Sequence, residues 1–295
     1  MYSDTHFHFK HLVENNSVDF GSEILSQMAT KNCFFGMDIG TRHDDLFRRG
    51  SCLIQAIENI EDEVLQNRAR KFTYLSAGIW PDVDSIHERY SRIQELEENI
   101  NDFINDENIL SNKIVAIGEG GIDHHWNPSG ADGRQESDFD RDTVEGEKEL
   151  FEMQLALAKK LNLPFIIHSR DAFFDTLDSI KNAGYDNGIV HCFSYGKDEA
   201  KAFLDRGWYI SLSGAVTYAK KSNMDAMKEM IAYIPKDRLL VETDSPYLAP
   251  IPLRGTENNP VNIRYTYDFI SSARNISTSK LCEIVDENIK SLFKI

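Results

Sequence analysis

Two histidines stand two residues apart near the start of this sequence, in Asp4-Thr5-His6-Phe7-His8. Alternate side chains of a β-strand share a face, so both imidazoles would point the same way if this segment is a strand. Two imidazole nitrogens on one face can bind the same metal ion. Asp4 shares that face, where it would either orient a ligand or form a hydrogen bond in the core. The pair indicates a metal site, although the same spacing also occurs in ordinary buried strands.

Apolar runs elsewhere in the chain also end in a histidine or a carboxylate. The run KIVAIG is followed by Glu119, PFII by His168 and GIV by His191. A further run, LLV, is followed by Glu242 and Asp244, which would share one face of a strand. Because ionisable side chains are rarely buried without partners, these positions are candidates for a functional site.

Arg170 follows His168 by two residues and would lie on the same face. Its planar guanidinium group can bind phosphate oxygens through two parallel hydrogen bonds, which makes it a candidate phosphate clamp. A salt bridge to one of the neighbouring acids is an equally good interpretation of this arginine.

Short apolar runs alternate with longer amphipathic segments along the chain. Runs that are apolar throughout are typical of parallel strands buried on both faces. Strands that alternate with helices predict right-handed parallel crossovers, and eight such units close a TIM-type (β/α)8 barrel. We therefore predict an α/β barrel that forms a single domain over residues 1–295. The predicted strands are Tyr2–His8, Cys33–Gly40, Thr73–Ile79, Ile114–Glu119, Pro164–His168, Gly188–Phe193, Trp208–Ser213 and Arg238–Thr243.

A doubly wound open sheet shows the same alternation and is the structural alternative. The dinucleotide-binding fingerprint GxGxxG that would support it is absent, because Gly118-Glu119-Gly120-Gly121 does not match it. The polar, acidic segment 124–147 lacks a clear period and is predicted to be a long loop after the fourth strand. Such a loop either is solvated or overhangs the mouth of the barrel. Helices are predicted at Asp84–Ile104, Gly146–Leu161 and Asn262–Phe293.

The predicted barrel brings the polar strand ends together. The C-terminal ends of its strands meet at one mouth, where active sites form. Six imidazole and carboxylate groups in one pocket are costly to desolvate unless cations balance them. This mixture of ligands suits Zn²⁺, Mn²⁺ or Mg²⁺, and the residue types do not choose among these ions. The six residues are His6, His8, Glu119, His168, His191 and Asp244.

The ordered motifs DTHFH, GEGGID, PFIIHSRDA, HCFSYG and LLVETDSPYLAP resemble those of the TatD-related deoxyribonucleases, within the amidohydrolase-like metal-dependent hydrolases. The resemblance covers essentially the whole chain. It implies a TIM-type barrel with two divalent metal ions that hydrolyses phosphodiester bonds, typically by removing nucleotides from the 3′ ends of DNA. Two such ions bind the phosphate, lower the pKa of a water molecule and stabilise the departing alkoxide.

The resemblance also implies roles for individual residues. Asp244 is placed to accept the proton of the attacking water. Glu242 matches the acid of the family's ETD motif, and it is either a second acid–base group or a residue that orients a ligand histidine. The metal ligands implied by the resemblance are His6, His8 and Asp244 for the first ion, His168 and His191 for the second, and Glu119 as the bridging carboxylate.

Hydrolysis of a carbonyl substrate, as in other amidohydrolases or an aminoacyl-tRNA deacylase, is the alternative activity. Many of those relatives bridge their metals with a modified lysine at the end of the fourth strand, where this chain has Glu119. An inactive scaffold would be expected to have lost ligands, whereas all six are present here. The residues therefore favour a nuclease.

Composition limits the partners of the protein. The 295 residues include 32 basic and 48 acidic side chains, which gives a formal net charge of −16. This balance argues against a protein that coats nucleic acid or binds a membrane surface. Four widely spaced cysteines and an N-terminus without the features of a signal peptide predict a cytoplasmic protein. We expect weak, local contacts with nucleic-acid ends, no membrane contact and no obligate protein partner.

Overall fold

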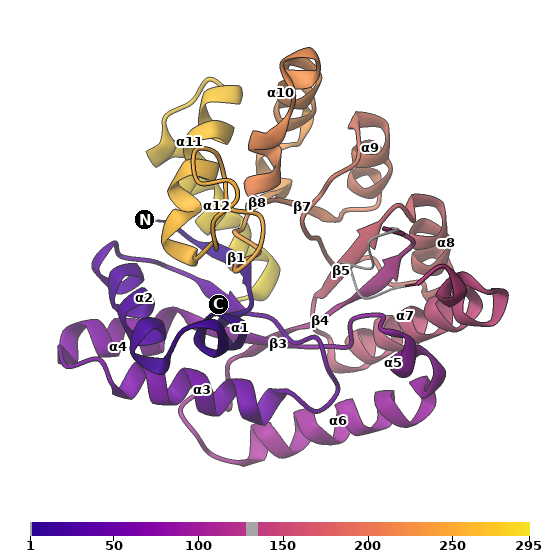
Figure 1. Ribbon diagram of the computed structural model, residues 1–295, viewed down its shortest axis with the longest axis horizontal. Coiled ribbons are helices and arrows are strands. Elements are labelled where there is room, and N and C mark those ends of the chain that lie inside the picture. The colour runs from indigo at the N-terminus through magenta and orange to yellow at the C-terminus, as the bar shows by residue number, and fades with distance from the viewer. Residues whose placement is uncertain (1, 128–134) are drawn as a thin grey trace.

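The computed structural model describes residues 2–127 and 135–295, and these ranges contain eight parallel strands. The strands pair in chain order, each with the next. The C-terminal end of β8 returns to β1, where the backbone N–H of His8 donates to Ser245 at 2.7 Å and that of Asp244 donates to His6 at 2.9 Å. The predicted (β/α)8 barrel is therefore confirmed (Figure 1). The strands are β1 (Asp4–Phe7), β2 (Gly36–Asp38), β3 (Thr73–Ala77), β4 (Ile114–Asp123), β5 (Phe165–Arg170), β6 (Gly188–Val190), β7 (Tyr209–Leu212) and β8 (Leu239–Val241).

Helices surround the strands and cover their outer faces (Figure 1). The contact between α7 and β4–β5 illustrates the packing, because Phe151 of α7 lies 5.5 Å from Phe165 of β5 between ring centroids, and both side chains are fully buried. The α-helices are α1 (Phe9–Asn15), α2 (Val18–Thr30), α3 (Leu46–Glu58), α4 (Glu63–Phe72), α5 (Val83–His87), α6 (Arg89–Asn105), α7 (Arg141–Leu161), α8 (Phe173–Ala183), α9 (Lys197–Asp205), α10 (Met224–Tyr233), α11 (Ile263–Ala273) and α12 (Thr278–Phe293).

The segment predicted as a loop over residues 124–147 is shorter than expected. Helix α7 already begins at Arg141, because the side chain of Asp140 accepts a hydrogen bond from the backbone N–H of Thr143 at 2.8 Å and caps the helix. Residues 128–134 of the predicted loop lie outside the described residues. The part of the prediction that covers 141–147 was wrong.

Several other boundaries differ from the predicted ones, and the helix predicted over Asp84–Ile104 is divided into α5 and α6. Strand β4 continues past Glu119 to Asp123, because it pairs with β5 up to the partners Asp123 and Arg170. The helix predicted over Asn262–Phe293 is divided into α11 and α12, since the side chain of Ser277 accepts from the backbone N–H of Lys280 at 3.1 Å and starts a new helix. These changes extend, shorten or divide elements without altering the order of the barrel.

Among the described residues, no helix combines the length and the apolar character needed to cross a membrane.

Candidate metal centre

His6 of β1 and His8, which directly follows this strand, point into the same cluster, as the alternation of side chains predicts. Both side chains are buried, and their ring centroids lie 5.2 Å apart. His6 Nε2 lies 2.7 Å from Glu119 Oε2 and 3.6 Å from Asp244 Oδ1. His8 Nε2 lies 3.4 Å from the same oxygen of Asp244 and 3.8 Å from Glu119 Oε2. Two imidazole nitrogens and two carboxylates therefore surround one point.

Asp4 joins β1 to the residue that follows β8. Its carboxylate accepts hydrogen bonds from the backbone N–H of Thr243 at 2.9 Å and from the Thr243 hydroxyl at 2.6 Å. Burial raises the pKa of Asp4 to about 8, although these hydrogen bonds act in the opposite direction. Of the two roles left open for Asp4, the structure shows the hydrogen bond in the core. This bond fixes the backbone immediately before Asp244.

Asp244 adopts a left-handed backbone conformation, with φ at 56°. This region is uncommon for residues other than glycine, and aspartate tolerates it better than most. The backbone N–H of Asp244 donates a hydrogen bond to the carbonyl oxygen of His6. The left-handed conformation then directs the Asp244 carboxylate towards the side chains of His6 and His8. A strained backbone at a strand end is typical of a functional site.

Glu119 lies between the two groups of histidines. Its Oε2 atom faces His6 at 2.7 Å and lies 3.8 Å from His191 Nε2, while its Oε1 atom lies 3.8 Å from His168 Nδ1. The side chain is only 6% exposed, so few water molecules can reach it. The carboxylate can therefore contact a cation held on either side of it.

His168, near the end of β5, and His191, which directly follows β6, form the second group. His168 Nδ1 lies 3.2 Å from His191 Nε2. The other nitrogen of His168, Nε2, lies 2.9 Å from Asp123 Oδ2. Asp123 thereby orients the ring so that Nδ1 faces Glu119.

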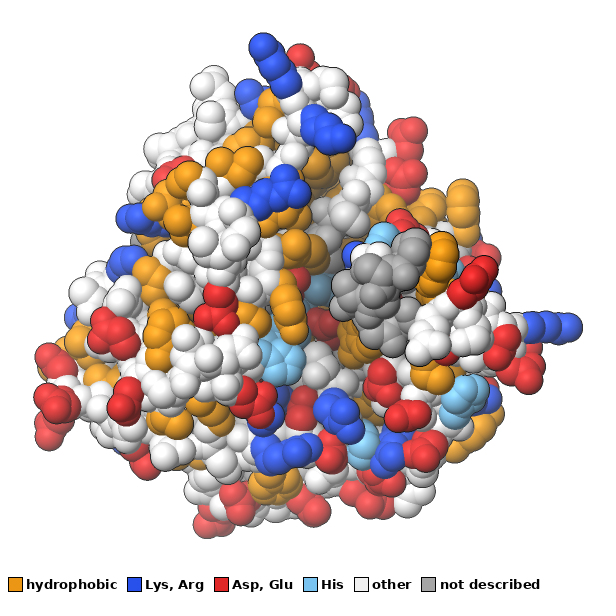
Figure 2. All heavy atoms as spheres, viewed as in Figure 1, with side chains coloured by type: hydrophobic (Ala, Val, Ile, Leu, Met, Phe, Trp, Pro, Cys, Tyr) orange, Lys and Arg blue, Asp and Glu red, His pale blue; other side chains and the backbone are white. Residues whose placement is uncertain are grey.

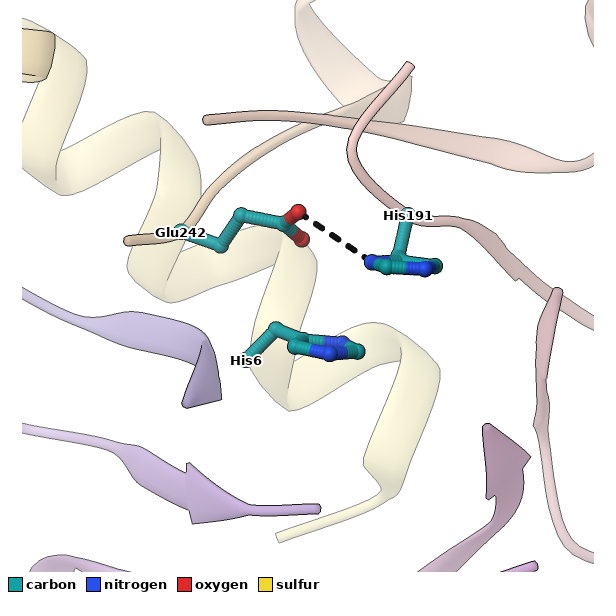
Figure 3. A group of neighbouring side chains, drawn as sticks. All are labelled: His6, His191 and Glu242. Carbon is teal, nitrogen blue, oxygen red and sulfur yellow. Dashed lines mark ion pairs between the residues drawn. The ribbon is translucent and has the colours of Figure 1, made fainter. Parts of the chain in front are cut away.

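Glu242 occupies the equivalent position behind His191. One of its oxygens, Oε1, accepts a hydrogen bond from the backbone N–H of Cys192 at 2.6 Å and lies 3.5 Å from His191 Nδ1. Figure 3 shows Glu242 pointing at His191, whose ring stacks on that of His6 with centroids 4.1 Å apart. Glu242 is fully buried. Glu242 was predicted to be either an acid–base group or a residue that orients a ligand histidine, and these contacts fit the second role.

The charges of the cluster attract cations. Burial raises the pKa of Glu119, but His191 and His6 outweigh this effect and hold the pKa well below its usual range. Burial lowers the pKa of His191, but Glu119 and Glu242 outweigh it and raise the pKa to about 9. The ionised carboxylates therefore favour positive charge on their neighbours in this pocket. Protons on the histidines or bound metal ions can supply that charge.

Several buried polar atoms of the cluster form no hydrogen bond of good geometry among the described residues, including both ring nitrogens of His6 and Glu119 Oε2, although His6 Nε2 and Glu119 Oε2 lie 2.7 Å apart. Such atoms are costly to bury unless a ligand satisfies them. Three groups of side chains offer nitrogen or oxygen atoms within 4.8 Å of one another. The donors fit divalent metal ions. The groups are His6 with His8 and Glu119, Glu119 with His168 and His191, and His6 with His191 and Glu242.

Asp123 was not among the residues predicted for the site. The signal was present, because Asp123 stands four residues after Glu119 and shares its face in a regular strand. Arg170 is the register partner of Asp123 on β5. Burial raises the pKa of Asp123, but the hydrogen bond to His168 and the charge of Arg170 contribute to a net lowering. Arg170 thus lies beside an acid of the site, and its contact with phosphate stays a prediction.

Comparison with known sequences decides the family. The sequence model of the TatD related DNase family matches residues 3–294. The chain belongs to this family. It is therefore a metal-dependent hydrolase, as predicted from its motifs.

Relatives of the TatD family include the uncharacterized metal-dependent hydrolase YabD of Bacillus subtilis, with 36% identity over 76% of this chain and 78% of that protein. The uncharacterized metal-dependent hydrolase YcfH of Escherichia coli K12 is 36% identical over 62% of this chain and 63% of that protein. The 3′-5′ ssDNA/RNA exonuclease TatD of Rahnella is 32% identical over 81% of this chain and 84% of that protein. YjjV, a TatD homologue from Escherichia coli K12, shares the fold with a TM-score of 0.76 and 22% identity, over 100% of this chain and 98% of that one.

Proposed function

We propose that the protein is a divalent-metal-dependent deoxyribonuclease that removes nucleotides from the 3′ ends of single-stranded DNA. The position of Glu119 between two groups of histidines carries this proposal, because one carboxylate there can serve two ions. The TatD relative named as a 3′-5′ ssDNA/RNA exonuclease supports the type of reaction. Four cysteines that remain free thiols are consistent with a cytoplasmic location, which forms part of the proposal.

Six residues would hold the two ions. When bound, two divalent ions neutralise a phosphodiester and favour attack by water. The first group would use Nε2 of His6, Nε2 of His8 and Oδ1 of Asp244, and the second Nδ1 of His168 and Nε2 of His191. Glu119 would contribute one oxygen to each group.

The remaining residues would orient groups and transfer protons. Asp244, with its side chain 13% exposed, is the carboxylate that would accept the proton of the attacking water. Glu242 would hold His191 through its contact with Nδ1. Arg170 would contact a phosphate oxygen from the side of His168.

The test is hydrolysis of 3′-labelled and 5′-labelled single-stranded oligonucleotides with Mg²⁺, Mn²⁺ or Zn²⁺ added. We expect stepwise shortening from the 3′ end. His168→Ala should reduce turnover by on the order of a hundredfold. The exposed His87 provides a matched control, and His87→Ala should retain full activity.

Parallel assays with an ester and an aminoacyl-tRNA separate the nuclease from a carbonyl hydrolase. Cleavage of the carbonyl substrates without cleavage of oligonucleotides would overturn the proposal. Full oligonucleotide activity in His168→Ala would show that the second group of histidines does not serve the reaction.

A further inference from the structure

A recess of about 280 Å³ opens beside His8, next to the metal centre. Strand β1 and helix α1 provide one wall, with His8, Lys10 and His11. The segment between β2 and α3 and the first turns of α3 provide the other wall, which includes Arg42 and Arg48. We call this feature the cationic recess. In Figure 2, blue Lys and Arg side chains lie beside red acidic ones along the lower part of the central hollow.

The floor of the cationic recess consists of one buried guanidinium group between two carboxylates. The guanidinium group of Arg49 is 4% exposed and contacts Asp38 at 2.6 Å and Asp45 at 2.9 Å. Asp45 also accepts hydrogen bonds from the backbone N–H groups of Thr41 and Arg42, at 3.0 and 3.1 Å. These contacts hold the wall between β2 and α3 in place, so the outer side chains project from a rigid base.

The rim of the cationic recess is positive. Arg42 and Arg48 both contact Asp44, at 3.5 and 2.9 Å, so one carboxylate serves two guanidinium groups. The side chains of Arg42 and Arg48 are 63% and 57% exposed, so their remaining donors can reach a ligand. Lys10 pairs with Glu14 nearby. The lining of the recess thus has four basic side chains against three acidic ones, whereas the whole chain has a net charge of −16.

We propose that the cationic recess binds a backbone phosphate of a nucleotide next to the scissile bond. This inference rests on the proposed nuclease function and adds a second point of contact to it. Guanidinium groups bind phosphate oxygens through paired hydrogen bonds, and phosphate contacts position a nucleic acid without reading its sequence. His8 lines both the cationic recess and the metal centre. A single-stranded DNA substrate would therefore pass from the metal centre towards α3.

The recess predicts a preference for substrates with more than one phosphate. The experiment compares kcat/KM for pentathymidylate with that for the p-nitrophenyl ester of thymidine 5′-phosphate, which has a single phosphodiester. In Arg42→Gln/Arg48→Gln, we expect the ratio of the two values to fall at least tenfold. The salt slope for pentathymidylate should also become shallower by roughly 0.7, as expected for one lost phosphate contact on a single strand.

Two further variants separate a phosphate contact from a general charge effect. Lys181→Gln/Lys280→Gln removes the same charge from α8 and α12, at exposed side chains that do not line the recess. Its substrate ratio should equal that of the wild type. Arg48→Lys keeps the charge but loses the paired donors, and its ratio should lie between those of the wild type and the double variant.

The outcomes distinguish the recess from the nuclease itself. If the wild type cleaves pentathymidylate and the double arginine variant keeps the same substrate ratio, the proposed phosphate contact in the recess is overturned and the proposed nuclease function stands. If the substrate ratio falls equally in Lys181→Gln/Lys280→Gln, the proposed phosphate contact in the recess is likewise overturned. If the wild type cleaves no oligonucleotide, anisotropy of fluorescein-labelled pentathymidylate replaces kinetics. Tenfold weaker binding of pentathymidylate by the double arginine variant then supports the phosphate contact without the nuclease function. Equal binding overturns both proposals.

Discussion

One ring nitrogen of His168, Nε2, lies 2.9 Å from Asp123 Oδ2, and the other, Nδ1, faces Glu119 and His191. The contact selects which nitrogen of His168 can bind a metal ion, because a nitrogen that donates a hydrogen bond to a carboxylate cannot also donate a lone pair to an ion. Glu242 makes a longer contact with His191, with Oε1 3.5 Å from Nδ1, and leaves Nε2 of this ring facing Glu119. Each histidine of the second group is thus oriented by its own buried acid.

The variant Asp123→Asn tests this relationship. The amide keeps the size of the side chain but removes its charge, so we expect metal affinity to fall by roughly 10–100-fold. The thermal midpoint without metal should change little by comparison. Isothermal titration with Mn²⁺ measures the affinity, and an unchanged dissociation constant would show that Asp123 does not act through His168.

Glu119→Gln tests the shared position of this carboxylate. The variant keeps the shape of the side chain and removes the one anionic group that faces both sets of histidines. We therefore expect both metal sites to weaken together. Elemental analysis after dialysis measures the stoichiometry. Retention of a full complement of metal would mean that Glu119 serves only the turn after the apolar run.

Metal removal should lower the stability of the fold. Buried atoms such as His6 Nε2 and Glu119 Oε2 gain partners when an ion binds, and binding to the folded state alone stabilises it by mass action. At about 100 times the dissociation constant this effect is about 2.7 kcal/mol, or a rise on the order of 5 °C in the thermal midpoint. Thermal scans with metal and with EDTA measure it, and Glu119→Gln provides the control with a smaller rise. Coincident wild-type scans would contradict a metal site at these residues.

The dependence on salt should be shallow for short single strands. A net charge of −16 repels a polyanion at long range, so attraction depends on local contacts with few phosphates. Each phosphate neutralised on a single strand contributes a slope of roughly 0.7, so we expect a total slope of about one to two. Measurement of kcat/KM across a salt series gives this slope. A steep slope together with a strong preference for long strands would indicate an extended basic groove instead.

The buried carboxyl of Asp286 gives a dependence of stability on pH. It accepts a hydrogen bond from the Ser3 hydroxyl at 2.6 Å, and burial raises its pKa above the ordinary value. The raised pKa means that the folded state favours the protonated carboxyl. As the pH rises, the carboxyl loses its proton first in the unfolded chain, so stability is lost between the pKa of the unfolded chain and that of the folded protein. Asp286→Asn keeps an acceptor for Ser3 and removes this loss.

We therefore expect the free energy of unfolding of Asp286→Asn to increase relative to the wild type between pH 4 and pH 7. Urea denaturation at each pH measures the difference. A difference that is constant over this range would show that the carboxyl of Asp286 titrates alike in the folded and unfolded chains.

The sequence alone determined the features that depend on local periodicity. His6 and His8 share a face because side chains alternate along a strand, and Glu119, His168 and His191 follow apolar runs that have the length of a strand. The order of strands and helices then predicts the barrel, since parallel crossovers have one hand. The start of α7 was also readable, because Asp140 is a capping residue, but the polar residues around it concealed the signal.

Only the tertiary structure decided which side chains orient the ligands and where the cationic recess lies. The contact of Asp123 with His168 spans 45 residues, and Glu242 reaches the backbone of Cys192 across 50. Lys10 and Arg48 line one recess because β1 pairs with β2 and α1 packs next to α3. Distances of this kind follow from register and packing between elements, and neither is encoded in the spacing of residues along a single segment.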